Sequence, residues 1–198
     1  MRAACVLALA LAVSACDPER PPPVTQRSPS LDADDVAVVK ALFDGLLRPG
    51  RLPGARLLVV DKTMAACRRD PDSFGSRVGP CVRDGHVELA FGILPAPAAR
   101  ALALKFPAWN AASLSIAAPL GDDVVYISPT LVDGLAPSEL QRSYPAGSDV
   151  IMLSAPVYPA PRVAVIVFSI ASGPRAARLE RQSDGGWRVA AHAGGAVD

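Results

Sequence analysis

Residues 149–192 constrain the fold more than any other stretch, because they contain successive apolar runs separated by turn residues. Both alternating faces of the run 163–170 are apolar, which predicts a strand at the centre of a sheet, covered on both sides. The next run, 175–182, alternates apolar and polar residues, as a strand with one solvated face does. The C-terminal part of the chain therefore predicts an antiparallel sheet.

The last two strands are predicted to form a hairpin, because residues 183–186 have the turn sequence Ser-Asp-Gly-Gly. A two-residue loop would pair Leu179 with Ala190, whereas a three-residue loop would pair Leu179 with Ala191. We favour the three-residue loop because it collects polar side chains on one face, and a slip by one residue would invert the faces. Trp187 then lies on the face of Leu179.

The solvated face of this hairpin is a candidate binding surface for a protein partner. The alternative is that these charged residues only protect an exposed sheet edge from aggregation, because such an edge has the same pattern of charged residues. The candidate residues are Arg178, Glu180, Arg188 and His192.

The first sixteen residues resemble the signal peptide of bacterial lipoproteins. Arg2 precedes a short apolar run, too short to span a membrane, and the segment ends in the lipobox-like sequence Val-Ser-Ala-Cys. The resemblance implies cleavage before Cys16 and attachment of acyl chains such as palmitate to that cysteine, which anchor the protein in a membrane. The alternative is an ordinary signal peptide with an incidental cysteine. We expect a domain that faces the cell envelope, in the periplasm.

Three parts of the chain follow from this interpretation. Residues 1–15 are the signal peptide, 16–31 are the lipidated cysteine and a proline-rich tether, and 32–198 are a single domain. The hydrophobic content of 51% is enough for a sizeable core. Loss of Arg2 with the signal peptide lowers the 20 basic residues to 19, which equals the 19 acidic residues. This balance argues against nucleic acid as a partner.

Two main helices are predicted before the C-terminal sheet. The first spans 32–47, begins at Asp32 or Asp34 and ends before Pro49-Gly50. The second lies within 95–113, and a helical turn is predicted at 137–142. Strands are predicted at 57–60 and 124–127. The fold class is therefore α+β, an antiparallel sheet of about five to six strands packed with two main helices. The predicted buried face of the first helix contains Val36, Val39, Phe43, Leu46 and Leu47, and that of the second contains Ala98, Leu102 and Phe106.

Cys67 and Cys81 are predicted to form a disulfide, because they are the two cysteines left in an oxidising compartment once Cys5 is cleaved and Cys16 is lipidated. A bond that closes this loop contributes ~3 kcal/mol in the chain-entropy model. The alternative is a metal site with His86, but the spacing lacks a CxxC pair and a fourth ligand.

The sequence contains no nucleophile elbow, phosphate loop, dinucleotide fingerprint or zinc-protease motif. We therefore expect a protein that is not an enzyme and that needs no cofactor or metal.

The residues from Asp184 to Val189 resemble the final hairpin of the NTF2-like family, whose fold is a bent antiparallel sheet around helices. This resemblance implies a cavity for a small ligand or a hydrolytic site. The acidic and histidine pocket residues of such enzymes have no counterparts here, so the activity is not carried over. The order of elements is also similar to that of uncharacterised envelope lipoproteins.

Three functions are compatible with these features. The first, which we expect, is a non-catalytic binding lipoprotein that docks an envelope protein; an immunity protein against an envelope-targeting toxin is one form of it. The second is an NTF2-like small-ligand-binding or hydrolytic domain, which an apolar pocket with convergent polar groups would favour. The third is a structural or assembly lipoprotein.

Overall fold

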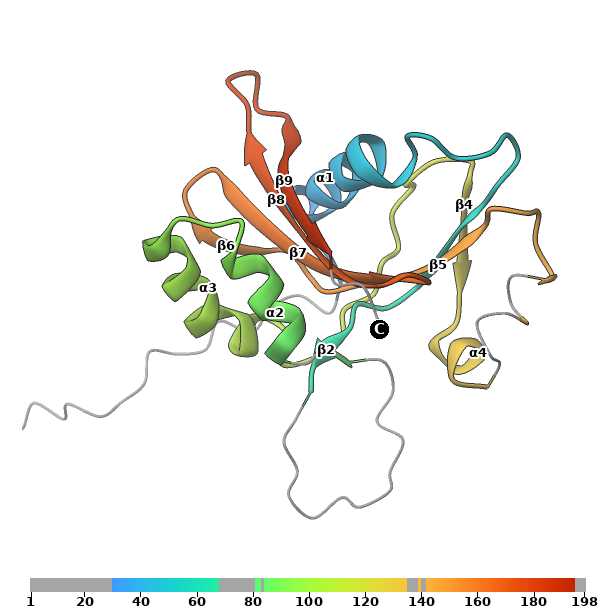
Figure 1. The fold of residues 1–198 in the computed structure, drawn as a ribbon, viewed down its shortest axis with the longest axis horizontal. Helices are drawn as coiled ribbons and strands as arrows, with labels where there is room; N and C mark the ends of the chain where they lie inside the picture. The colour runs from blue at the N-terminus through green and yellow to red at the C-terminus, as the bar shows by residue number, and fades with distance from the viewer. Residues whose placement is uncertain (1–29, 68–80, 83, 135–138, 140–141, 195–198) are drawn as a thin grey trace, which may run out of the picture.

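The computed structural model describes residues 30–67, 81–82, 84–134, 139 and 142–194, and places helices on both faces of a central sheet (Figure 1). The helices are α1 Ala33–Leu42, the π-helix η1 Phe43–Leu47, α2 Asp84–Phe91, α3 Ala96–Trp109 and α4 Pro129–Gly134. The strands are β1 Leu57–Val60, β2 Ala65–Ala66, β3 Cys81–Val82, β4 Val124–Ile127, β5 Asp149–Leu153, β6 Val157–Ala160, β7 Val163–Ile170, β8 Gly173–Arg181 and β9 Trp187–Gly194.

The predicted α+β class is confirmed, but the sheet is mixed and not wholly antiparallel. The sheet has seven strands. Six of them follow the order β4-β1-β5-β7-β8-β9, and the seventh, β6, pairs with β7. β1 lies parallel to both of its neighbours, β4 and β5. Parallel neighbours need long crossover connections, and the segment between β1 and β4 supplies one because it contains α2 and α3. β5, β7, β8 and β9 pair antiparallel, as predicted.

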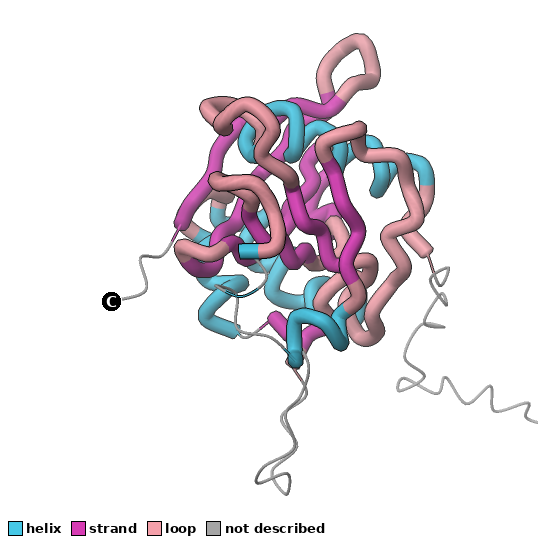
Figure 2. Tube along the Cα trace, turned by 90° about the vertical axis from the view of Figure 1, so that its right-hand side faces the viewer, coloured by secondary structure: helices cyan, strands magenta, loops and turns pink. Residues whose placement is uncertain are grey.

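β7 is covered on both faces, which confirms the prediction from its sequence. Its side chains Ala164, Ile166 and Phe168 belong to a first core between the sheet and α1–η1. Val165 and Val167 belong to a second core, on the opposite face, beneath α2 and α3. Figure 2 shows the strands running through the centre of the molecule, with helices outside them. The predicted strand 57–60 is also confirmed, and all four of its residues are buried.

The first helix has the predicted extent, but its last turn has π geometry. Asp32 caps it in a capping box, since Asp32 accepts a hydrogen bond from the Asp35 N–H at 2.8 Å and the Asp35 side chain accepts one from the Asp32 N–H. At the other end the Arg48 N–H donates to the Phe43 carbonyl, five residues back. The wider turn alters which side chains face the sheet. The buried apolar residues are Val38, Val39, Leu42, Phe43 and Leu47, and the predicted Val36 and Leu46 are only partly buried.

The second predicted helix is also confirmed. Ala98, Leu102 and Phe106 are its buried residues, as expected. Pro107 lies inside α3 near its C-terminal end, and the helix continues to Trp109. The helical turn predicted at 137–142 lies largely outside the described residues. No helix in the described part of the chain is long and apolar enough to cross a membrane.

The register of the β8–β9 hairpin differs from the prediction. Leu179 pairs with Val189, not with Ala191. The physical reason is the position of the turn: the Gln182 N–H donates to the Gly186 carbonyl, so the turn is centred on Asp184 and not on Gly185. Trp187 nevertheless lies on the face of Leu179, because the pairing is displaced by two residues and the faces alternate with a period of two.

Candidate functional site

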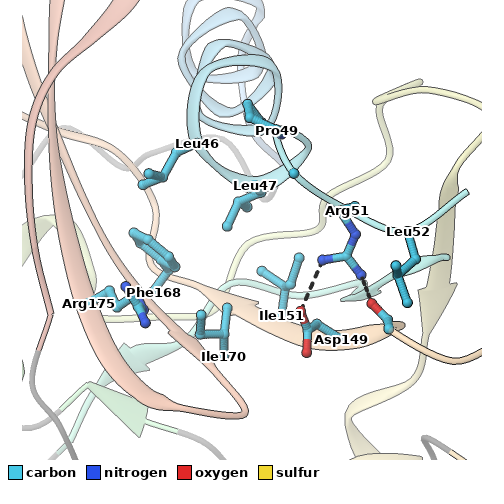
Figure 3. Close-up of a pocket in the computed structure, with 12 residues that line it drawn as sticks. Leu46, Leu47, Pro49, Arg51, Leu52, Asp149, Ile151, Phe168, Ile170 and Arg175 are labelled. Atoms are coloured by element: carbon cyan, nitrogen blue, oxygen red, sulfur yellow. Dashed lines mark hydrogen bonds and ion pairs between the residues drawn. The ribbon is translucent and has the colours of Figure 1, made fainter.

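A pocket of about 340 Å³ opens between the end of η1, the loop that follows it and the sheet (Figure 3). Its volume falls in the range of about 300–1,000 Å³ that is typical of small-molecule sites. Three neighbouring parts of the first core supply an apolar wall: η1, β5 and β7. The apolar side chains are Leu46, Leu47, Ile151, Phe168 and Ile170.

The loop after η1 closes one side of the pocket through Arg51. The Arg51 guanidinium donates from Nη1 to Asp149 Oδ2 at 3.0 Å, and from Nη2 to the carbonyls of Arg56 and Gly147. Only 15% of the Arg51 side chain is exposed. Arg51 therefore fastens this loop to the start of β5, and its charge is matched by Asp149.

Gly50 and Gly147 have φ values of 78° and 80°, which favour glycine. A Cβ on Gly147 would also lie 3.2 Å from Leu52. The loop after η1, which contains Gly50, and the loop before β5, which contains Gly147, therefore both depend on glycine.

Arg175, on β8, lies on the opposite side of the pocket from Arg51 (Figure 3). Its Nη2 donates to Ser172 Oγ at 2.9 Å. Its Nε is buried without a hydrogen-bond partner, and none of the described carboxylates forms an ion pair with it. The Nε of Arg51 is likewise buried without a partner. Buried unpaired donors cost stability. The Nε of Arg178, which does not line the pocket, is a third such donor among the described residues.

Arg48, which directly follows η1, is bound very differently. It donates to both carboxylate oxygens of Asp123, from Nε at 2.9 Å and from Nη2 at 2.8 Å. It also contacts Asp44 and the Leu120 carbonyl. The hydrogen bonds from Arg48 hold the pKa of Asp123 below its usual value of 3.8, and those to Asp123 raise the pKa of Arg48. This junction joins the end of η1 to β4.

The predicted polar surface on the hairpin is only partly brought together. Glu180 pairs with Arg188 across the strands and lies 3.3 Å from Arg178, so these three share a face. A bulge next to Arg178 changes the register, and His192 pairs with Ala177 on the other face. Arg178 also donates to the Ile93 carbonyl at 3.0 Å, which fixes it against the segment between α2 and α3.

The predicted disulfide between Cys67 and Cys81 is confirmed, with an S–S distance of 2.03 Å and a Cα–Cα distance of 5.0 Å. Cys16, the signal peptide and the tether up to Pro29 lie outside the described residues. Within the described ranges, no three His, Cys, Asp or Glu side chains gather in an arrangement suited to a metal ion.

An aromatic cluster joins α1, α3, β6 and β9 on the same face as the first core. The Tyr158 hydroxyl donates to Asp35 Oδ1 at 3.0 Å, and burial raises the pKa of Tyr158 far above its usual value of 10.0. The Tyr158 ring centroid lies 6.5 Å from that of Trp109 and 5.9 Å from that of Trp187. These contacts fix the helices on the sheet.

The pocket residues were not identified from the sequence. Arg51, Asp149 and Arg175 are 26 to 124 positions apart, and they come together through the sheet and through the packing of η1 on the first core. The one local signal is Arg175, a charged residue beside the apolar end of β7. No protein-family model matches the chain, and no curated protein or solved structure is similar to it.

Proposed function

We propose that this protein is a non-catalytic, lipid-anchored binding protein of the bacterial cell envelope, and that its binding site is the pocket beneath η1. The observation that carries the proposal is the combination of an apolar wall with three charged groups, Arg51, Asp149 and Arg175, around a volume of about 340 Å³. Such a combination is typical of sites that hold a small molecule by its apolar body and orient it by a few polar contacts.

The chemistry of the lining supports binding over catalysis. Among the described residues that line the pocket there is no serine, threonine, cysteine, histidine, lysine or tyrosine, the side chains that usually act as nucleophiles or as bases. Its one carboxylate, Asp149, is ion-paired with Arg51 at 3.0 Å.

The anchor and the compartment rest on the lipoprotein-like N-terminus. The disulfide between Cys67 and Cys81 agrees with an oxidising compartment. Mass spectrometry of the mature protein tests this part directly: we expect acylated Cys16 at the N-terminus, and an unmodified cysteine there would contradict the anchor.

The pocket is tested by purifying the protein from its native membrane and weighing it intact by native mass spectrometry. We expect a small molecule to remain with the wild type and to be lost from Ile170→Trp, which fills the pocket from its β7 side. Leu104→Trp is the matched control, because Leu104 is 81% exposed on α3 and lies outside the pocket lining. Equal retention by all three proteins, or retention by none, would contradict the proposed site.

A second candidate function is docking of an envelope protein, of which an immunity protein against a toxin is one form. It is supported by α3, which exposes apolar side chains. Leu104 and Trp109 are 81% and 41% exposed, and Arg100 and Lys105 lie on the same helix. Cross-linking in native envelopes tests it: a partner captured by the wild type and lost from Leu104→Asp would support docking through α3. Capture that Leu104→Asp leaves unchanged would contradict it.

A further inference from the structure

The charges around the pocket do not cancel. Arg51 is matched by Asp149, whereas Arg175 has no carboxylate partner among the described residues. The lining therefore has one positive charge in excess, on the side formed by β8. A half-buried cation at a pocket is stabilised by an anion that enters it.

The hydrogen-bond donors of Arg175 also favour an anionic ligand. A guanidinium offers only donors, and Ser172 occupies Nη2 at 2.9 Å while Nε is buried and unpaired. A carboxylate has two acceptor oxygens in one plane and matches a guanidinium in charge and in geometry, so it supplies the negative charge that none of the described carboxylates supplies to Arg175.

The remainder of the pocket is apolar. Leu47, Ile151, Phe168 and Ile170 line the space between Arg175 and the Arg51–Asp149 pair. A ligand that reaches Arg175 and fills this space needs an apolar body, which a sugar or a nucleotide lacks. At the far side, the charge of the Arg51 guanidinium is already matched by Asp149, so a second anionic group is not needed there.

We infer that the pocket binds a small amphipathic monoanion, a single carboxylate on a short acyl body, with its carboxylate at Arg175 and its body along η1 and β7. This inference rests on the proposed function, because it names the ligand class of the same pocket. A dianion would leave one negative charge unmatched, and a cation would be repelled by Arg175.

The test uses the full mature chain in lipid nanodiscs, with empty nanodiscs as the blank for partition into lipid. Octanoate, octan-1-ol and octylamine are titrated by calorimetry; the three share one body and differ in the charge of the head. We expect octanoate to bind at least about tenfold more tightly than octan-1-ol, and octylamine not to bind, because a charge-assisted hydrogen bond is lost in each case.

Variants assign the effect to Arg175. Arg175→Gln should lower the affinity for octanoate about tenfold and leave that for octan-1-ol unchanged, and Arg175→Lys should retain part of the affinity. Lys40→Gln is the matched control, because Lys40 is an exposed cation on α1 that does not line the pocket and its loss should change neither affinity. A circular dichroism melt verifies that each variant is folded.

The outcomes separate the inference from the proposed function. Equal affinity for octanoate and octan-1-ol, insensitive to Arg175→Gln but abolished by Ile170→Trp, would overturn the monoanion and keep the pocket as a binding site. Binding of none of the three probes by the wild type, together with no molecule retained from the native membrane, would overturn both.

Discussion

The junction around Arg48 and the pocket around Arg175 both adjoin η1, and they use arginine in opposite ways. Arg48 donates to both oxygens of Asp123 and also contacts Asp44 and a carbonyl. Arg175 makes one hydrogen bond, to Ser172, and has a buried unpaired Nε. We propose that this difference reflects two roles: Arg48 holds the end of η1 to the start of β4, whereas Arg175 binds a ligand.

Removal of the disulfide should lower the stability of the fold and leave ligand binding nearly unchanged. The Cys67→Ser/Cys81→Ser double variant should lose about 3 kcal/mol of unfolding free energy, because the bond closes a long loop. Its affinity for octanoate should stay within about twofold, since Val82, next to Cys81, packs in the second core and the pocket lines the first. Chemical denaturation and calorimetry measure the two quantities. A tenfold loss of affinity would show that the two faces of the sheet are coupled.

Arg48→Met should destabilise the protein by about 2 kcal/mol, because it leaves Asp123 and the Leu120 carbonyl without their donor. The measurement is urea denaturation, with Arg188→Met as the control for loss of an exposed positive charge, which should cost at most about 0.5 kcal/mol. A cost for Arg48→Met as small as that of the control would mean that the junction is not structural.

Arg175→Met, unlike Arg48→Met, should not lower the unfolding free energy. Methionine keeps an apolar stem of similar length and removes an unpaired buried donor, so the unfolding free energy should stay the same or rise by up to about 1 kcal/mol. The same denaturation series measures it beside Arg48→Met. A loss as large as that of Arg48→Met would show that Arg175 supports the fold, and it would remove the contrast between the two arginines.

The smallest expected effect is the dependence of the junction on pH. The pKa of Asp123 is lowered in the folded protein, so its contribution to stability is present above about pH 3.8 and is lost as the pH falls below that value. Because 35% of the Asp123 side chain is exposed, we expect only about 0.5–1 kcal/mol. The difference in unfolding free energy between the wild type and Asp123→Asn, measured from pH 7 to pH 2, should shrink with acidity. The same difference measured in an Arg48→Met background should not depend on pH, and a persistent dependence there would contradict the role of Arg48.

Local patterns in the sequence were sufficient for most of the elements. Periodicity and capping located the first helix, with Asp32 as one of two predicted caps, and the two-sided apolar pattern identified β7 as a central strand. The pairing of Cys67 with Cys81 followed from the cysteines that remain once the lipoprotein resemblance accounts for Cys5 and Cys16. The helix and the strand are each determined by residues close together in the sequence, and the disulfide by elimination of the other two cysteines. These features could therefore be predicted from the sequence.

Strand direction, register and the pocket depend on contacts that no local pattern contains. The four residues of β1 are apolar whichever way the strand runs, so its parallel pairing could not be predicted. The bulge beside Arg178 moved His192 to the other face. The π turn at η1 moved Leu46 toward the edge of the core, where it lines the pocket. The pocket itself is assembled from segments brought together by the sheet.

A methyl-labelled NMR titration of the full chain with octanoate tests directly whether the pocket beneath η1 binds a ligand. We expect shift changes at the methyl groups of Leu46, Leu47, Ile151 and Ile170, which line the pocket, and none at Val87 and Val165 in the second core. Changes confined to the second core, or uniform small changes over the whole protein, would contradict a specific site beneath η1.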